Sequence, residues 1–264
     1  MISKILLYAL AGYLIFLATL FIFQRKLLYL PEKFRLPEEQ AMAEGLVYWP
    51  SFENFRGFVS HMEPTGALGT VIVFHGNAGA AYHRIFYVKA LTRQKMRVIL
   101  AEYPGYGGRA GKLSEDALVK DAIETIRLAY KEYGQPLFIW GESLGAGVAC
   151  GAVSKAEVPI KGVVLLLPWD SLPDLAQTHY WYLPARWMVL DKYDNVENLR
   201  GFEGNVAVIL AENDEVIPVR HGRRLYDSIT SRKNIWVFKD ARHNEFPIDA
   251  KLHWWKEVVE FISQ

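Results

Sequence analysis

The feature that most constrains the fold is a junction between an apolar run and a glycine-rich turn. Leu137-Phe138-Ile139-Trp140 leads directly into Gly141-Glu142-Ser143-Leu144-Gly145, and small residues follow at 146–153. G-x-S-x-G between a buried strand and a helix predicts a nucleophile elbow, a strained turn that lifts the serine hydroxyl above the sheet. Glycines flank the serine because side chains there would collide with neighbouring backbone. Ser143 is therefore the candidate nucleophile, and the alternative is an ordinary Gly-Ser loop.

Serine is a weak nucleophile by itself, so later segments must supply an acid and a base. With such an elbow the chain order is serine, acid, histidine, each after a later strand. The apolar run 206–211 predicts a strand, and three carboxylates follow it. Asp214 is favoured because it stands just before Val216-Ile217-Pro218, where the loop turns into a helix expected at 219–231. Glu212 and Glu215 remain alternatives.

The candidate base is His243. It follows a strand expected at 234–238, which is the required place in the order. Other histidines do not follow core strands in that order: His61, His179, His221 and His253. Asp214 would hold His243 in one tautomer and stabilise its imidazolium form without taking the proton. The alternative for His243 is a solvated loop histidine.

An oxyanion hole needs two donors. The backbone N–H of Leu144 follows the serine and supplies one. The β-branched run 69–74 predicts another strand, and the loop after it reads His75-Gly76-Asn77-Ala78-Gly79. We expect the backbone N–H of Asn77 to be the second donor. His75 is expected to be structural, a neutral imidazole that hydrogen-bonds neighbouring loops.

Four motifs carry a family resemblance. Three belong to the segments described above: His75-Gly76-Asn77-Ala78-Gly79, the serine elbow and Asn213-Asp214-Glu215-Val216-Ile217-Pro218. The fourth is Glu102-Tyr103-Pro104-Gly105-Tyr106-Gly107. The sequence resembles the α/β-hydrolase superfamily, and more narrowly its membrane-anchored α/β-hydrolase domain-containing branch, which is sometimes filed with prolyl-oligopeptidase-type or serine aminopeptidase-like hydrolases. Two further segments fit that branch: residues 23–31, and Leu183-Pro184-Ala185-Arg186-Trp187 with Lys192-Tyr193-Asp194.

The resemblance implies a fold and a class of reaction. The fold is α/β: a mostly parallel, twisted sheet with helices on both faces and a small cap insertion. Relatives include esterases, thioesterases that remove fatty acyl groups from proteins, and proteins filed as peptidases. One segment departs from the pattern, because residues 52–58 lack the usual Asp-Gly hairpin. The first hairpin is therefore left open.

The remaining pattern agrees with such a sheet. Strands are expected at 97–102 and 162–167, and an amphipathic helix is expected at 114–133 with Ser114 at its start. A closing helix is expected at 247–262. Alternating strands and helices of this length predict parallel strands joined by crossovers.

Composition excludes several classes of function. The chain has 264 residues and a net charge of +1, so no electrostatic argument favours nucleic acid. Its single cysteine, Cys150, excludes an intrachain disulfide and suits a small buried position in the helix after Ser143. No ligand spacing for a metal and no dinucleotide or P-loop pattern is present. We therefore expect no metal and no cofactor.

The N-terminal segment is the second strong signal. Residues 5–23 carry no charge and would be roughly 28 Å long as a helix, close to the hydrocarbon thickness of a bilayer. An uncleaved transmembrane anchor is favoured over a signal peptide, because the apolar run is long and no small-x-small site follows it. Basic residues after the run (Arg25, Lys26, Lys33 and Arg35) outnumber Lys4 before it, which favours a cytoplasmic catalytic domain. The expected division is 1–26 for the anchor and 27–264 for the catalytic domain.

Between about 169 and 204 the strand–helix pattern breaks, and aromatic residues gather there. An insertion at this place would form a cap over the active site. We expect an apolar acyl-binding wall and predict five substrate-binding residues: Tyr106, Trp169, Tyr180, Trp181 and Trp187. Ordinary packing of the cap onto the core is the alternative.

Three functions are compatible with these residues. The favoured one is a serine hydrolase of esters or thioesters with lipophilic acyl chains, whose substrate is a small molecule or an acylated protein. A peptidase or amidase would need a clamp for a peptide terminus, and Arg186 and Arg242 are the only candidates. The third is a catalytically silent binding protein tethered to the lipid bilayer, which would not need a serine, an acid and a histidine in this order.

Overall fold

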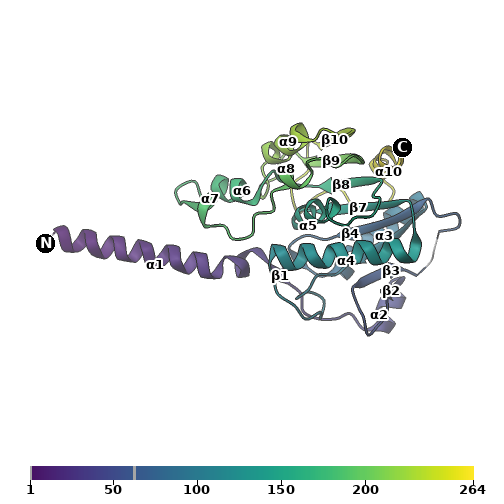
Figure 1. Cartoon of the computed structure of the whole chain (residues 1–264), viewed down its shortest axis with the longest axis horizontal. Coiled ribbons are helices and arrows are strands. Elements are labelled where there is room, and N and C mark those ends of the chain that lie inside the picture. Colours follow the sequence, from purple (N-terminus) through teal and green to yellow (C-terminus); the bar gives the residue numbers. More distant parts are fainter. Residues whose placement is uncertain (1, 62–63) are drawn as a thin grey trace.

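The computed structural model describes residues 2–61 and 64–264. Its centre is an eight-stranded sheet in the order β10-β9-β8-β7-β4-β6-β3-β2 (Figure 1). The strands from β10 to β6 are parallel, whereas β3 is antiparallel to β6 and to β2. The strands are β2 (Leu46–Trp49), β3 (Gly57–Ser60), β4 (Gly69–Phe74), β6 (Met96–Ala101), β7 (Leu137–Glu142), β8 (Gly162–Leu166), β9 (Asn205–Ala211) and β10 (Lys233–Phe238). The short strands β1 (Leu30–Pro31) and β5 (Ala78–Gly79) form a separate parallel pair.

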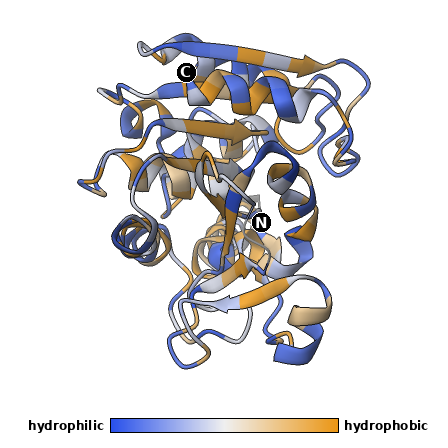
Figure 2. Cartoon of the chain, turned by 90° about the vertical axis from the view of Figure 1, so that its right-hand side faces the viewer, coloured by the Kyte–Doolittle hydropathy of each residue, from blue (hydrophilic) through white to orange (hydrophobic). Residues whose placement is uncertain are grey.

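Helices cover both faces of the sheet, which confirms the expected fold class. The helical segments are α1 (Ile2–Leu28), α2 (Glu38–Ala43), η1 (Ala81–Arg84), α3 (Ile85–Leu91), η2 (Thr92–Gln94), α4 (Glu115–Tyr133), α5 (Leu144–Val153), α6 (Leu172–His179), α7 (Ala185–Met188), α8 (Asn195–Asn198), α9 (Val219–Ser228) and α10 (Trp254–Ser263). One hydrophobic core contains side chains of α4, α5 and α9, and the other contains side chains of α3 and α10. Successive residues of one strand alternate between the two: Ile139 belongs to the first and Trp140 to the second. Figure 2 shows hydrophobic residues concentrated in the strands, whereas the helices carry both hydrophobic and hydrophilic residues.

The first hairpin, which the sequence left open, is formed by β2 and β3 with Trp49 opposite Gly57. Aromatic packing holds the loop between them. The Phe55 ring lies 4.9 Å from the Tyr48 ring and 5.0 Å from the Phe58 ring, and all three side chains are buried. Buried rings therefore fix this connection without an Asp-Gly turn.

The start of helix α4 follows the expectation, whereas α9 ends at Ser228 instead of residue 231 and the closing helix begins later than expected. Ser114 is the N-cap of α4, and its hydroxyl accepts a hydrogen bond from the Ala117 N–H at 3.2 Å. The closing helix was expected from residue 247 but begins at Trp254. The Trp254 and Trp255 indole N–H groups donate to the carbonyls of Pro247 and Asp249, at 3.2 and 3.0 Å. These side chains satisfy carbonyls of the preceding loop, so that expected start was wrong.

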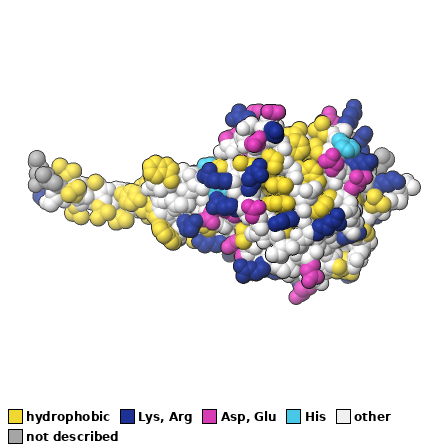
Figure 3. All heavy atoms as spheres, turned by 90° about the horizontal axis from the view of Figure 1, so that it is seen from above, with side chains coloured by type: hydrophobic (Ala, Val, Ile, Leu, Met, Phe, Trp, Pro, Cys, Tyr) yellow, Lys and Arg dark blue, Asp and Glu magenta, His cyan; other side chains and the backbone are white. Residues whose placement is uncertain are grey.

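Helix α1 projects from the rest of the molecule, and hydrophobic side chains cover it (Figures 1 and 3). Its segment Ser3–Leu28 contains an 18-residue window with a mean hydropathy of 2.4, and it is long and apolar enough to cross a membrane. The partly buried positions of α1 share one face of its C-terminal half: Leu17, Leu20, Gln24 and Leu28. This face contacts the segment between β8 and β9, which contains α6, α7 and α8 and which we call the cap.

Candidate active site

Ser143 lies on a strained turn between β7 and α5. Its backbone has φ 51° and ψ −113°, a conformation that L-residues rarely adopt. The neighbouring glycines are required by space. A Cβ added at Gly145 would lie 1.9 Å from the Phe74 carbonyl oxygen, and one at Gly141 would lie 2.5 Å from the Gly145 carbonyl oxygen. The turn has the geometry that the G-x-S-x-G sequence predicts.

The structure brings Ser143, His243 and Asp214 together in one chain of contacts. Ser143 Oγ lies 3.2 Å from His243 Nε2, and His243 Nδ1 lies 2.8 Å from Asp214 Oδ2. His243 reaches this place from the loop after β10, and Asp214 from the loop after β9. Nδ1 faces a carboxylate and so carries the proton, which leaves Nε2 free to accept the serine proton. These distances are within the reach that general-base catalysis at Ser143 would require.

The choice among three carboxylates in the loop after β9 is visible in their contacts. The side chain of Asp214 is only 2% exposed. Its Oδ1 accepts hydrogen bonds from the backbone N–H groups of Val216 and Ile217, at 2.9 and 2.6 Å. Glu215 instead lies 3.5 Å from Arg242, and Glu212 is exposed. Asp214 is thus fixed by two N–H donors with its second oxygen aimed at His243.

The loop after β4 presents a free N–H group near the elbow. Asn77 accepts hydrogen bonds at its carbonyl oxygen from the Leu30 N–H (3.0 Å) and the Tyr106 hydroxyl (2.8 Å). The Asn77 side chain donates to the Leu28 carbonyl at 3.0 Å. Within the described ranges, the backbone N–H groups of Asn77 and Leu144 have no partner. Both predicted oxyanion donors are therefore available to a ligand.

His75 connects this loop to neighbouring segments through hydrogen bonds. Its Nδ1 donates to the Gly76 carbonyl at 2.8 Å, and its Nε2 lies 3.0 Å from Glu102 Oε1. Glu102 also accepts from the Ala81 N–H, and Tyr103 donates its hydroxyl to the His75 carbonyl. His75 and Glu102 are both buried, so their contact links the loop after β4 to the segment that follows β6. His75 therefore has the structural place that the sequence predicted for it.

Sequence reasoning missed an ion pair on the other side of the loop. Arg84 Nη2 lies 2.9 Å from Glu142 Oε1, and the Tyr87 hydroxyl donates to Glu142 Oε2 at 3.0 Å. Burial raises the pKa of Glu142, but the charge and hydrogen bonds of Arg84 outweigh burial and hold the pKa below its usual range. A Cβ added at Gly76 would lie 3.1 Å from Glu142 Oε1, so the Arg84–Glu142 pair packs against the loop after β4. In the sequence, only the position of Glu142 next to Ser143 suggested that its side chain lies near the site.

A third histidine–carboxylate pair, also buried, joins α9 to the cap. His221 Nδ1 lies 2.7 Å from Asp170 Oδ1, and Arg224 Nε lies 3.1 Å from Asp170 Oδ2. His221 Nε2 faces the Thr178 hydroxyl at 3.0 Å. The pair joins α9 to α6 and to the end of β8. No pattern in the sequence singles out Asp170.

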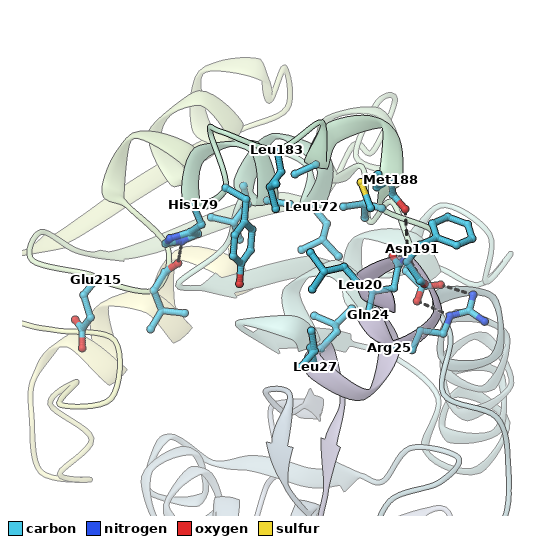
Figure 4. A pocket seen from close by; sticks show the side chains of 18 residues that line it. Leu20, Gln24, Arg25, Leu27, Leu172, His179, Leu183, Met188, Asp191 and Glu215 are labelled. Atoms are coloured by element: carbon cyan, nitrogen blue, oxygen red, sulfur yellow. Dashed lines mark hydrogen bonds and ion pairs between the residues drawn. The ribbon is translucent and has the colours of Figure 1, made fainter. Parts of the chain in front are cut away.

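An apolar cavity of about 530 Å³ lies between the cap and the C-terminal turns of α1 (Figure 4). Leu172, Leu175 and Leu183 line it from the cap, and Glu215 and Val216 line it beside Asp214. Ser143 and His243 are not part of its lining. The cavity begins at the neighbours of the candidate triad and extends away along α1.

The five aromatic residues predicted to bind substrate lie in three different environments. Tyr180 lines the cavity. Trp181 and Trp187 are 78% and 80% exposed and border a more open hollow on the outside of the cap. Tyr106 and Trp169 are buried, and the Trp169 indole donates to the Tyr193 carbonyl at 3.2 Å. Tyr106 holds Asn77, as described above, so these two side chains support the site from within the core.

The described residues hold no group of three or more histidine, cysteine, aspartate or glutamate side chains that could bind a metal. Cys150 is buried in α5, and burial raises the pKa of its thiol. A thiolate nucleophile at Cys150 is therefore disfavoured.

Comparison with known proteins agrees with this geometry. Residues 65–197 match the family model described as serine aminopeptidase, S33. The chain belongs to that family. It is thus a member of the α/β-hydrolase superfamily, as the motifs suggested.

Curated relatives of this S33-family hydrolase include two kinds of protein. An uncharacterised protein of Mycobacterium tuberculosis is 29% identical over 238 residues, which covers 84% of this chain and 81% of the relative. The lysophosphatidylserine lipase ABHD12 of Gallus gallus is 30% identical over 202 residues, which covers 69% of this chain. The aligned region is 52% of that lipase, so the chain spans about half of its length.

Solved structures share the fold of the S33-family hydrolase. The esterase Pf2001 of Pyrococcus furiosus superposes with a TM-score of 0.65 at 16% identity, covering 89% of this chain and 97% of the esterase. A monoacylglycerol lipase of Paleococcus ferrophilus gives a TM-score of 0.56 at 21% identity, with 74% and 94% covered.

Proposed function

We propose that this hydrolase cleaves carboxylic esters or thioesters of lipophilic acyl chains. Ser143 is the nucleophile, His243 the general base, and Asp214 the carboxylate that orients His243. The observation that carries the proposal is the chain of contacts from Ser143 Oγ to His243 Nε2 (3.2 Å) and from His243 Nδ1 to Asp214 (2.8 Å), at a strained elbow. A binding protein would have no need for that strain or for this proton path.

The reaction is acyl transfer to water in two steps. Ser143 Oγ attacks the carbonyl carbon while His243 Nε2 takes the serine proton. The N–H groups of Asn77 and Leu144 bind the oxyanion, and each donor of this kind contributes about 3 kcal/mol to transition-state stabilisation. The carbon–oxygen or carbon–sulfur bond then breaks, and His243 gives its proton to the leaving group. His243 next deprotonates water, which attacks the acyl-enzyme and releases the acid and Ser143.

The substrate class is supported by the surroundings of the site. The cavity beside it is walled mainly by leucine and other apolar side chains, which suits an acyl chain. Lipases and esterases are among the relatives and structural neighbours of this chain. The two arginines considered as a peptide clamp are engaged: Arg186 pairs with Asp174, and Arg242 lies near Glu215 and Glu245. A hydrolase of this class needs no cofactor.

The proposal includes the membrane. Helix α1 would anchor the hydrolase to a lipid bilayer, with residues 27–264 as the catalytic domain and residues 169–204 as the cap. Arg25, Lys26, Lys33 and Arg35 favour a cytoplasmic catalytic domain. Resistance of the full chain to carbonate extraction, together with protease access to the domain in inside-out vesicles, would test both statements.

The first experiment is hydrolysis of p-nitrophenyl esters by the detergent-solubilised full chain. We expect Ser143→Ala to lose activity by at least about 10⁴-fold. Ser154→Ala is a matched control, because Ser154 is exposed at the C-terminal end of α5 and should leave the rate unchanged. Labelling with a fluorophosphonate probe should fail for Ser143→Ala alone.

Other outcomes would redirect the proposal. Equal activity of the wild type and Ser143→Ala would remove Ser143 from the mechanism. Turnover of amino-acid p-nitroanilides with no turnover of esters would make the protein a peptidase. No turnover and no probe labelling would favour the binding-protein hypothesis.

A further inference from the structure

The cavity between α1 and the cap has a wall that the catalytic fold does not supply. We propose that this cavity holds the acyl chain of a membrane lipid ester and that the last turns of α1 are part of the substrate-binding site. The inference rests on the proposed ester hydrolysis and adds a second role for the anchor. It makes the binding site incomplete without the membrane helix.

The wall is built from one face of α1. Leu20, Phe21, Gln24, Leu27 and Leu28 line the cavity. Figure 4 shows Leu20 and Leu27 on one side of the space, with Leu172 and Leu183 of the cap on the other. Its volume of about 530 Å³ lies within the range of roughly 300–1,000 Å³ that is typical of small-molecule sites. A long apolar space of this size suits a flexible hydrocarbon chain.

Polar contacts hold α1 against the cap, so this wall has a defined position. The Gln24 side chain donates to the Met188 carbonyl at 3.1 Å and accepts from the Leu190 N–H at 2.8 Å. Arg25 makes two bonds of 2.9 Å to Asp191. Asp191 is 5% exposed at its side chain and also accepts from the Glu115 N–H at the start of α4. A loose tether would need none of these contacts, whereas a cavity wall does.

The inner end of the cavity is lined by residues that adjoin the candidate active site. Leu28, in the wall, accepts a hydrogen bond at its carbonyl from the side chain of Asn77, whose N–H is the proposed oxyanion donor. On the other side, Glu215 and Val216 line the cavity and directly follow Asp214. An ester carbonyl at Ser143 would therefore lie at one end of the cavity with its acyl chain directed along α1.

The outer end faces the region that a bilayer would occupy. From Ser3 to Phe16, the side chains of α1 are exposed and almost all apolar. The cap projects on the same side of the molecule as α1 (Figure 1), and its tip exposes Trp181, Tyr182 and Trp187. Tryptophan and tyrosine favour the interface between lipid and water. With α1 across the membrane, the cavity would lie at the bilayer surface, where a lipid chain can enter it.

The test is a change of chain-length preference. Leu20→Trp places a bulky ring in the cavity, and Ile22→Trp places the same ring on a 70% exposed position outside the lining. We expect Leu20→Trp to lower kcat/KM for p-nitrophenyl laurate relative to p-nitrophenyl butyrate by about tenfold, because several methylene contacts are lost. Ile22→Trp should keep the wild-type ratio. Equal ratios in the wild type and both variants would overturn the inference.

A second measurement does not depend on turnover. Full-length Ser143→Ala in nanodiscs is irradiated with a phosphatidylcholine that carries a diazirine in its acyl chain, and labelled peptides are mapped by mass spectrometry. We expect labels on cap residues 172–189, and a severalfold loss of these labels in Ser143→Ala with Leu20→Trp but not with Ile22→Trp. Labels confined to the outer surface of α1 would overturn the inference. Labelled cap peptides with inert esters would instead retain the lipid site and reject the proposed hydrolysis.

Discussion

His243 and His221 each lie within 2.8 Å of an aspartate, yet only His243 also lies beside the proposed nucleophile. The His243 side chain is 11% exposed, and its second nitrogen faces the hydroxyl of Ser143 on the strained elbow. His221 is fully buried, and its second nitrogen faces Thr178 inside the helix α6. A histidine–aspartate pair can therefore serve catalysis or packing. The two uses differ in the hydroxyl that faces the second histidine nitrogen, and in whether a substrate can reach that hydroxyl.

The partners of the two aspartates differ as well. Asp214 receives two backbone N–H bonds, and among the described residues it pairs with no lysine or arginine, so its charge is available to stabilise an imidazolium at His243. Asp170 is also paired with Arg224, and its carboxylate is thereby committed to a structural network. This comparison can be tested with matched substitutions at the two sites.

The largest expected effect comes from replacing each histidine by glutamine. His243→Gln should lower kcat for p-nitrophenyl butyrate by at least about 10⁴-fold, because glutamine cannot accept the serine proton. His221→Gln keeps a donor for Asp170 and should retain most of the activity. Rates are measured beside thermal unfolding of each variant. A folded His221→Gln protein as inactive as His243→Gln would break the comparison.

The next effect is on stability and its pH dependence. Burial raises the pKa of Asp170, but hydrogen bonds from His221 and the Ser171 N–H and the charges of His221 and Arg224 outweigh it, so the pKa lies below the usual 3.8. A carboxylate with a lowered pKa in the folded state stabilises the fold above its unfolded pKa, and this contribution is lost as pH falls through the folded value. Asp170→Asn should therefore lower the free energy of unfolding by about 3 kcal/mol at neutral pH.

Urea unfolding between about pH 6 and about pH 3 would check this, because the wild-type and Asp170→Asn curves should converge towards the acid end. Asp174→Asn is the control. Asp174 pairs with Arg186 at the surface, where side chains are 28% and 55% exposed, and such pairs contribute about 0–1 kcal/mol. If the free energy of unfolding of Asp170→Asn fell with decreasing pH as steeply as that of the wild type, Asp170 would not be the group that titrates in this window.

The smallest expected effect is on stability and comes from Thr178, the residue that faces the second nitrogen of His221. Thr178→Val removes the hydroxyl that faces His221 Nε2 at 3.0 Å. The loss of one hydrogen bond to a buried group should lower the free energy of unfolding by about 1 kcal/mol, with esterase activity unchanged. Thr178→Ser keeps the hydroxyl and serves as the matched control. A loss of activity in Thr178→Val at full stability would give the buried pair a functional role.

The regular elements were predictable because their signals are local. The run 69–74 coincides with β4, and Ser114 caps α4 as expected, since periodicity and capping depend on neighbouring residues. The elbow was visible for the same reason: its glycines and its serine are adjacent in the chain. The start of α10 was missed because Trp254 and Trp255 satisfy carbonyls of the preceding loop, and no local rule anticipates that contact.

The sequence by itself determined the fold class, the nucleophile turn and the order of Ser143, Asp214 and His243, because each depends on residue type at the end of a strand. Only the tertiary structure decided which side chains meet across the chain. It paired Arg84 with Glu142 and Asp170 with His221, and it moved Tyr106 and Trp169 into the core. It also made α1 a wall of the cavity. Such contacts join residues far apart in sequence, and their energy depends on burial and geometry that no local pattern carries.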